Sequence, residues 1–167
     1  MTEPTPIRPG GEPTGRMREF LGRHRYLSLA TRNPDASAHL VPVVYLFTDD
    51  RFLVATSSAT RKVRNLAADP AVTVTVDDRT TIEWVSAVGT AELLTGPESR
   101  ELNHRLYALW MTAEGLDVVG GLLHEVEDVT IVVTPDRWLA WSLESDVVPE
   151  LSAAGIPMDD PSRWFTI

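Results

Sequence analysis

The chain contains no cysteine, and only one of its 15 basic residues is a lysine, Lys62, the other 14 being arginines. Without cysteine, neither a disulfide framework nor a zinc site with thiolate ligands can form, which fits a reducing compartment. The amino-terminal segment has no apolar stretch of the kind that a secretory signal carries. We therefore expect a cytoplasmic protein.

Long hydrophobic runs and an excess of basic residues are also missing. The longest nearly continuous apolar run, residues 40–47, is far shorter than the ~20 residues that a membrane-spanning helix needs. The net charge of -9 opposes binding to a nucleic-acid backbone, which requires a broad basic surface. The composition therefore predicts no membrane span and no nucleic-acid partner.

Familiar catalytic and metal-binding motifs are absent as well. The four histidines lie far apart, and none has the H-E-x-x-H or a similar ligand spacing. The chain has no G-x-S-x-G elbow, no P-loop and no G-x-G-x-x-G, so the local mechanics of serine hydrolases, nucleoside triphosphatases and Rossmann proteins are lacking. We expect no metal site and no catalytic side-chain triad.

The 167 residues that are present suffice for one domain with a substantial core. Seven of the first 16 residues are proline or glycine, so residues 1–15 are predicted to be a disordered leader. Residues 16–144 are predicted to form the folded domain. Residues 145–167 form a tail whose apolar end, with Trp164 and Phe165, is expected to dock on that domain or on a second subunit.

Hydrophobic periodicity predicts a mainly β domain with inserted helices. Apolar positions three and four residues apart predict helices at residues 15–24, 60–69 and 95–115. Alternating or continuous apolar runs predict strands, the last of them a strand or hairpin, at residues 26–31, 39–47, 51–57, 71–78, 81–94 and 128–143. Six short strands in neighbouring hairpins favour a closed or nearly closed β-barrel.

Several residues carry more detailed predictions. Gly89 is expected at a bulge or bend of its strand. Thr95 and Glu98 have the spacing of a capping box, and Trp110 falls on the apolar stripe of the helix that follows. The glycine pair at 120–121 is expected to open a loop. Pro42 lacks a backbone N–H, so its strand is expected to be an edge strand, a bulged strand or one that faces something other than a strand.

The segment ATSSATRKVRNL, residues 55–66, is the strongest functional candidate. It predicts a strand end followed by a helix whose first turn carries Arg61, Lys62 and Arg64. The amino end of a helix is already electropositive, so these cations are explained if an anion such as a phosphate binds there. A solvated surface helix whose cations face water and Asp69 is the alternative. Three hydroxyl donors precede the helix, on Thr56, Ser57 and Ser58.

The chain has five tryptophans, which is many for its length. Three of them, Trp84, Trp138 and Trp141, fall on predicted strands. Each taken alone is expected to pack in the core, whereas together beside a phosphate site they are compatible with a pocket for a planar ring.

The run YLSLATRNPDASAHLVPVVYLFTDDRFLVATSSATRKVRNLAADPAVTVTV resembles the pyridoxamine 5'-phosphate oxidase-like split β-barrel family. It is most similar to the branch of flavin- and deazaflavin-dependent oxidoreductases that use coenzyme F-420. The resemblance covers residues 17–143. It implies a six-stranded split β-barrel that forms a homodimer, with the cofactor ring in a groove between the subunits.

The resemblance also implies roles for individual residues. The cofactor phosphate would be held by Thr56, Ser57, Arg61 and Lys62. The backbone of residues 39–45 would lie along the ring, which gives Pro42 a reason to stand on that strand. Trp84 falls near a position where the family places a ring contact. The predicted cofactor-binding set is His39, Val41, Pro42, Val43, Val44, Thr56, Ser57, Ser58, Arg61, Lys62 and Trp84.

The family resemblance further implies an activity. Oxidases of the FMN branch have an Arg and a Lys on the second strand, and residues 39–45 have neither. This favours a reductase that passes a hydride from the deazaflavin F-420 to a conjugated small molecule, with solvent, Tyr45 or His39 as the proton donor. The alternatives are an FMN-dependent oxidase or flavin reductase and a non-catalytic protein that binds a flavin, a deazaflavin or haem.

Overall fold

The computed structural model describes residues 11–123 and 127–156. Most of the predicted leader and the end of the tail, including Trp164 and Phe165, lie outside these ranges. The strands are β1 (Tyr26–Arg32), β2 (Ala38–Val44), β3 (Leu46–Thr48), β4 (Arg51–Ser57), β5 (Ala71–Asp78), β6 (Glu83–Thr95) and β7 (Asp128–Ser142). The helices are α1 (Gly15–Arg23), α2 (Arg61–Ala68), α3 (Gly96–Ala108), α4 (Ala113–Leu123), the π-helical turn η1 (Leu143–Val147) and α5 (Val148–Ala153).

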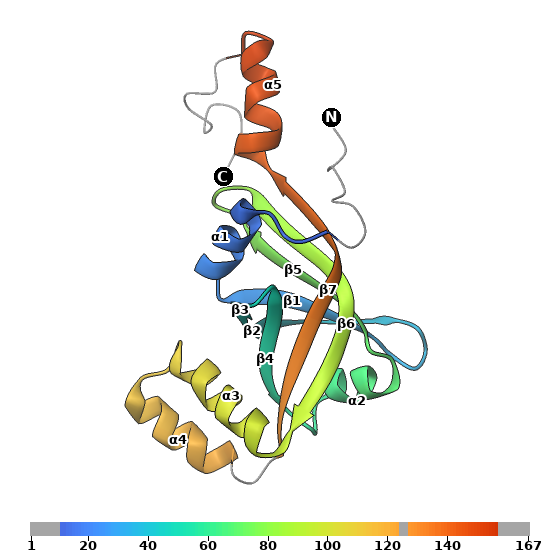
Figure 1. Ribbon diagram of the computed structural model, residues 1–167, viewed down its shortest axis with the longest axis vertical. Helices are drawn as coiled ribbons and strands as arrows, with labels where there is room; N and C mark the ends of the chain where they lie inside the picture. The colour runs from blue at the N-terminus through green and yellow to red at the C-terminus, as the bar shows by residue number, and fades with distance from the viewer. Residues whose placement is uncertain (1–10, 124–126, 157–167) are drawn as a thin grey trace.

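The seven strands form one curled antiparallel sheet in the order β2-β1-β5-β6-β7-β4-β3 (Figure 1). The prediction of a mainly β barrel fold with inserted helices is therefore confirmed. The sheet has seven strands where six were expected, because the predicted strand at residues 39–47 is divided at Tyr45. Its two halves, β2 and β3, lie at opposite ends of the sheet order, so the chain turns at Tyr45 from one edge of the sheet to the other.

Tyr45 makes this turn by anchoring itself in the core. Its side chain is 1% exposed, its backbone N–H donates to the carbonyl oxygen of Arg25 at 3.0 Å, and its hydroxyl donates to the carbonyl oxygen of Leu21 at 2.8 Å. Because β2 pairs only with β1 in the described sheet, Pro42 stands on an edge strand, opposite Ser28. The edge-strand prediction is confirmed.

The core fills the inside of the curl. The alternation of apolar and polar residues that predicted β5 matches its burial, since Val72, Val74 and Val76 are all buried. Helix α1 closes one side of the core with its buried Met17 and Phe20. The predicted bulge lies between Val88 and Gly89. A Cβ on Gly89 would collide with the carbonyl oxygen of Thr134, so the close approach of β6 and β7 there requires glycine.

Four predictions about the region after β6 are wrong. Helix α3 ends at Ala108 rather than near residue 115, and Trp110, expected in the core, is 45% exposed. Thr95 caps α3 without a side-chain hydrogen bond, so the capping box is absent. The glycine pair at 120–121 lies within α4. The apolar stripe misleads because α3 packs through buried polar groups, Ser99 and Asn103, as well as through Leu106.

The polar packing of α3 joins it to β4 and β7. The Nδ2 of Asn103 donates to the carbonyl oxygens of Thr56 and Val129 at 3.4 and 3.2 Å, and the hydroxyl of Thr130 donates to Oδ1 of Asn103 at 2.8 Å. The hydroxyl of Ser99 lies 3.0 Å from the hydroxyl of Thr130. These bonds fix α3 against the end of β4, which is also the strand that leads into α2.

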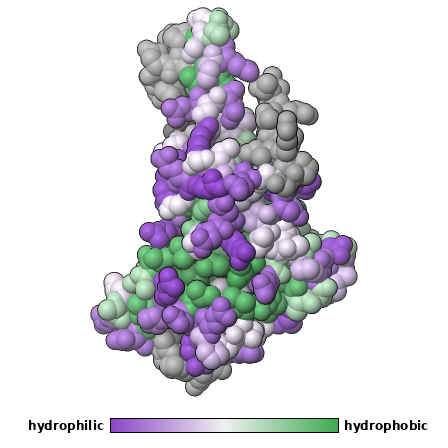
Figure 2. Space-filling model, in the orientation of Figure 1, coloured by the Kyte–Doolittle hydropathy of each residue, from purple (hydrophilic) through white to green (hydrophobic). Residues whose placement is uncertain are grey.

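Apolar side chains gather over the strands next to α3 on the face that Figure 2 displays. Several large apolar residues are at least 40% exposed, namely Tyr26, Leu40, Leu109, Trp110 and Val118. None of the described helices has the length and apolar character to cross a membrane.

Candidate functional site

The strand end at β4 and the start of α2 form a hydroxyl-lined junction. Thr56 is buried, and its hydroxyl lies 3.3 Å from the hydroxyl of Thr60. The Thr60 hydroxyl donates to the carbonyl oxygen of Ser57 at 3.0 Å. Thr60 is the N-cap residue of α2, but its side chain makes no capping hydrogen bond. The amide groups of the first turn of α2 therefore receive no side-chain cap.

Lys62 stands in this uncapped first turn. The first turn contains no acidic residue. Burial lowers the pKa of the Lys62 ammonium from its ordinary value of 10.5. Within residues 11–123 and 127–156, no hydrogen bond or ion pair joins Lys62 to another side chain. A partly desolvated cation at the positive end of a helix is an arrangement that an anion would stabilise.

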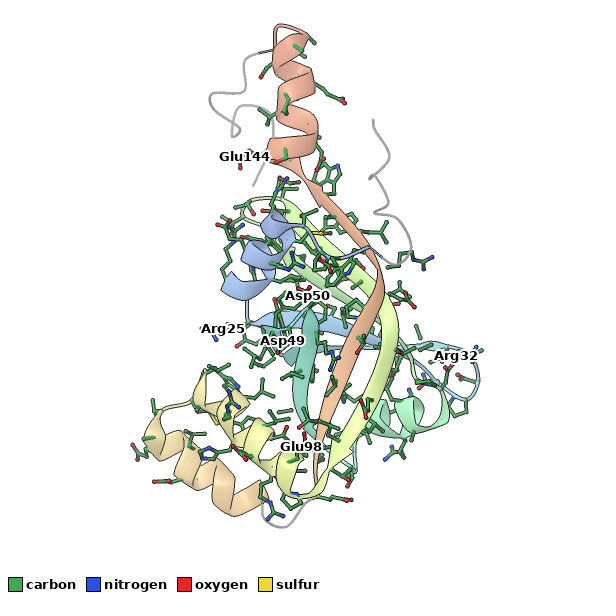
Figure 3. All side chains as sticks on the ribbon, viewed as in Figure 1. Arg25, Arg32, Asp49, Asp50, Glu98 and Glu144 are labelled. Atoms are coloured by element: carbon green, nitrogen blue, oxygen red, sulfur yellow. The ribbon has the colours of Figure 1, made fainter. Side chains whose placement is uncertain are left out.

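Arg61 lies on the side of α2 that faces the β1–β2 hairpin. It lines a cavity of about 640 Å³ together with Arg32, Arg64 and Asp69, whereas Lys62 does not line this cavity. Arg32 binds Asp69 at 2.6 Å, and Figure 3 places Arg32 beside α2. Arg64 Nη1 donates to the carbonyl oxygen of Ala59 at 2.6 Å. The structure thus gives the two predicted phosphate-binding cations different surroundings.

Asn65, which is buried, joins α2 to the β1–β2 hairpin and so orients the helix relative to it. Its Nδ2 donates to the hydroxyl of Thr31 and to Oδ1 of Asn33, both at 3.0 Å. Hydrogen bonds from Ser37 lower the pKa of Asp35 in this hairpin, and the positive charge of Arg61 lowers it further. Arg61 therefore lies within electrostatic reach of a carboxylate, unlike Lys62.

Strand β2, predicted to line a cofactor ring, lies at the sheet edge with partly accessible side chains. His39, Val41, Val43 and Val44 are half-buried, and Pro42 is exposed. A second cavity, of about 160 Å³, is lined by Val43 and Val44 of β2, Ala55 of β4, and Leu106, Tyr107 and Trp110. Because Ala55 directly precedes Thr56, this cavity connects β2 with β4, the strand that ends at the hydroxyl-lined junction.

The remaining predicted residues have diverse positions. Ser57 and Ser58 are half-buried at the end of β4, and the N–H of Ser58 donates to the carbonyl oxygen of Glu127 at 3.0 Å. Trp84 pairs in register with Trp141 and does not line either cavity. Trp138 is a core residue, 1% exposed.

Tyr45 and His39, the two side chains predicted as proton donors, differ in their access to a ligand. Tyr45 is buried in the core with its hydroxyl donated to a backbone carbonyl, and burial raises its pKa. It therefore has no access to a bound substrate. His39 is half-buried on β2 and remains a candidate.

Sequence reasoning missed two contributors to the site. Asn103 positions α3 against the end of β4, and among the described residues that line the 160 Å³ cavity Tyr107 alone has a side-chain hydroxyl. The signal for Tyr107 is its spacing of three residues from Trp110 in the helix expected at residues 95–115, which would place both rings on one side. The rings do meet, with centroids 6.1 Å apart in an edge-on arrangement.

Comparisons with known proteins place this geometry in context. The family model for pyridoxamine 5'-phosphate oxidase matches residues 13–142. A search of curated proteins finds no match. Among solved structures, a conserved hypothetical protein, Rv2991, from Mycobacterium tuberculosis is 25% identical with a TM-score of 0.65, over 78% of this chain and 84% of that chain.

Two further structures share the fold at lower identity. An F420 reductase is 23% identical with a TM-score of 0.60, over 75% of this chain and 97% of that chain. A pyridoxamine 5'-phosphate oxidase-related, FMN binding protein from Nostoc punctiforme is 14% identical with a TM-score of 0.54, over 78% of this chain and 81% of that chain.

Proposed function

The chain belongs to the pyridoxamine 5'-phosphate oxidase family, and from this premise we propose that it is a reductase that uses coenzyme F-420 as its hydride donor. Its substrate is a conjugated small molecule. The protein acts as a homodimer whose second copy covers the exposed apolar surface beside α3 (Figure 2), and it works in the cytoplasm.

The environment of Lys62 is the observation that carries this proposal. Its partly buried ammonium has no carboxylate partner in the described residues, and the amides of its helical turn lack a side-chain cap. A cofactor phosphate fits both features, since it supplies negative charge and several acceptor oxygens. Lys62 and the first-turn amides hold this phosphate. Hydroxyls from the end of β4 and the guanidinium of Arg61 assist, the hydroxyls being those of Thr56, Ser57 and Ser58.

The rest of the site orients and dries the ring of the cofactor. When bound, the reduced deazaflavin supplies a hydride. The backbone of β2 from His39 to Val44 would line the ring, and Trp84 would add a further ring contact. Val43, Val44 and Trp110 present apolar surface around the neighbouring cavity and exclude water from it. No catalytic triad is required, because the cofactor carries the chemistry and the protein supplies binding and orientation.

Two features favour F-420 over FMN. Residues 39–45 carry neither the Arg nor the Lys of the FMN-dependent oxidases, and an F420 reductase shares the fold over 97% of its own length. FMN is the second candidate, since an FMN binding protein shares the fold too.

A pair of titrations tests the proposal. We expect the full chain to quench the fluorescence of F-420 at lower protein concentration than that of FMN, and to oxidise reduced F-420 when an enone or quinone is added. Tighter binding of FMN would overturn the F-420 assignment. Binding of F-420 without oxidation by any member of an enone and quinone panel would instead indicate a carrier. The molar mass of the protein is measured by light scattering after size-exclusion chromatography. A mass of twice the chain mass would support the dimer, and the mass of one chain would refute it.

A further inference from the structure

We propose that Tyr107 recognises the substrate, by donating a hydrogen bond from its hydroxyl to the carbonyl oxygen of a small cyclic enone or quinone held between β2, β4 and α3. This inference rests on the proposed function, because it names the substrate class of the same site.

The cavity limits the size and polarity of its occupant. Five of its six lining residues contribute aliphatic or indole surface, from Val43, Val44, Ala55, Leu106 and Trp110. Its volume is about 160 Å³, and an apolar protein cavity of about 150 Å³ is large enough for one benzene molecule. The cavity therefore suits a single six-membered ring that is mostly apolar.

The hydroxyl of Tyr107 is available to that ring. No described residue forms a hydrogen bond with it, although the Tyr107 ring itself is held edge-on against Trp110. A partly buried hydroxyl without a protein partner gains stability from an acceptor on a ligand. Burial, and then the charge of Asp128, raise the pKa of Tyr107, so the phenol stays protonated and acts as a donor.

The nearby carboxylate of Asp128 selects against one class of acceptor. It accepts a hydrogen bond from Asn103 at 3.2 Å, and its charge reaches the Tyr107 hydroxyl. A carboxylate or phosphate ligand at the hydroxyl would be repelled, whereas a neutral carbonyl would not. A ring ketone conjugated with a carbon–carbon double bond satisfies the size, the polarity and the charge of the cavity.

The hydrogen bond also assists the reaction. When a hydride from the reduced deazaflavin forms a C–H bond at the β-carbon of an enone, the carbon–carbon π bond breaks and its electron pair moves through the conjugated system to the carbonyl oxygen. Tyr107 donates to this oxygen more strongly as its charge grows. A proton from solvent then completes the saturated ketone, so one hydride and one proton are consumed.

The variant Tyr107→Phe tests the role of the hydroxyl, and Tyr26→Phe is its matched control. Tyr26 is 66% exposed and lies outside the cavity, so its variant also loses one hydroxyl and keeps the ring. With 2-cyclohexenone we expect kcat/KM of Tyr107→Phe to fall by about 10- to 100-fold, while the dissociation constant for F-420 is unchanged. Tyr26→Phe is expected to match the wild type.

A binding measurement without cofactor separates this inference from the proposed function. Tryptophan fluorescence of the ligand-free protein, titrated with 2-cyclohexenone, is expected to give a weaker affinity for Tyr107→Phe than for Tyr26→Phe. Equal affinities or equal kcat/KM values in the two variants would overturn the role of Tyr107. Failure of F-420 to bind the wild type would overturn the proposed function, while the enone titration would still decide on the cavity.

Discussion

The arginines of α1 and Lys62 at the start of α2 have opposite surroundings. Arg16 and Arg23 both bind the carboxylate of Glu83, at 2.8 and 3.1 Å. Arg18 binds both oxygens of Asp50 at 2.7 Å, and Figure 3 shows Asp50 beneath α1. Lys62, by contrast, is partly buried with no ion pair in the described residues.

This difference separates cations that hold the fold from the cation that we propose binds the cofactor phosphate. The arginines of α1 join a helix to β6 and to the β3–β4 turn, and each is neutralised by a carboxylate. The charge on Lys62 opposes both burial and the helix dipole, so it adds nothing to the fold in the absence of an anion. Variants in the two regions are therefore expected to affect different measurements.

The largest expected effect is on cofactor affinity in Lys62→Gln. Loss of a charge-assisted bond to the phosphate is expected to cost about 1.5 to 3 kcal/mol, which corresponds to roughly a 10- to 150-fold rise in the dissociation constant for F-420. Arg79→Gln is the matched control, since Arg79 is an exposed cation bound to Asp77. An unchanged affinity in Lys62→Gln, measured by the same fluorescence titration, would contradict the proposal that the phosphate binds at the start of α2.

The next effect belongs to the α1 region and concerns folding. Glu83→Gln removes the shared partner of two arginines, and the Glu83 side chain is only 11% exposed. We expect its free energy of unfolding to fall by about 1 to 2 kcal/mol in urea denaturation, the sum of two favourable pairs. Glu92→Gln, on the exposed side of the same strand, is expected to leave stability unchanged. A loss of cofactor affinity in Glu83→Gln without a loss of stability would contradict the division between the regions.

The elements that the sequence predicted best are those whose pattern is local. Strand β5 alternates strictly and α2 follows a hydroxyl-rich strand end, so both formed as expected. The division of the strand at Tyr45 depends on a hydroxyl that bonds to Leu21, 24 residues away, and no local pattern contains that contact. The exposure of Trp110 was missed because apolar spacing alone does not distinguish a core position from an exposed apolar patch.

In the candidate site, too, the sequence predicted the features that depend on a local pattern and missed those that depend on distant contacts. The anion site near Lys62 was predicted from cations and hydroxyls that gather at the amino end of one helix, and both the helix and these residues can be read from the sequence. The cavity at Tyr107 requires α3 to lie against β4, and that packing depends on bonds from Asn103 to Thr56 and Val129, 47 and 26 residues away. Contacts at such separations are invisible to periodicity.

A smaller effect is expected from acid. The bond from Arg18 lowers the pKa of Asp50, and bonds from Thr80 lower the pKa of Asp78, with help from His24. Because both folded-state pKa values lie below the ordinary 3.8, these carboxylates stabilise the fold above that pH and lose this contribution as the pH falls through the lowered values. Thermal denaturation of Asp50→Asn is expected to depend less on pH below 4 than that of the wild type. An identical acid dependence would exclude Asp50 as a source.

The smallest expected effect is that of Lys62 on the stability of the cofactor-free protein, where its charge destabilises the fold. Since burial lowers its pKa below 10.5, the folded state binds this proton less tightly than the unfolded chain does. The charged form therefore costs stability at neutral pH, and stability rises as the pH increases from the lowered pKa toward 10.5. In the absence of cofactor, Lys62→Gln is expected to be as stable as the wild type or more stable by up to about 0.5 kcal/mol. It should also lose that alkaline rise in urea denaturation. A clear loss of stability would mean that Lys62 holds the fold, as the arginines of α1 do, and the contrast between the two regions would disappear.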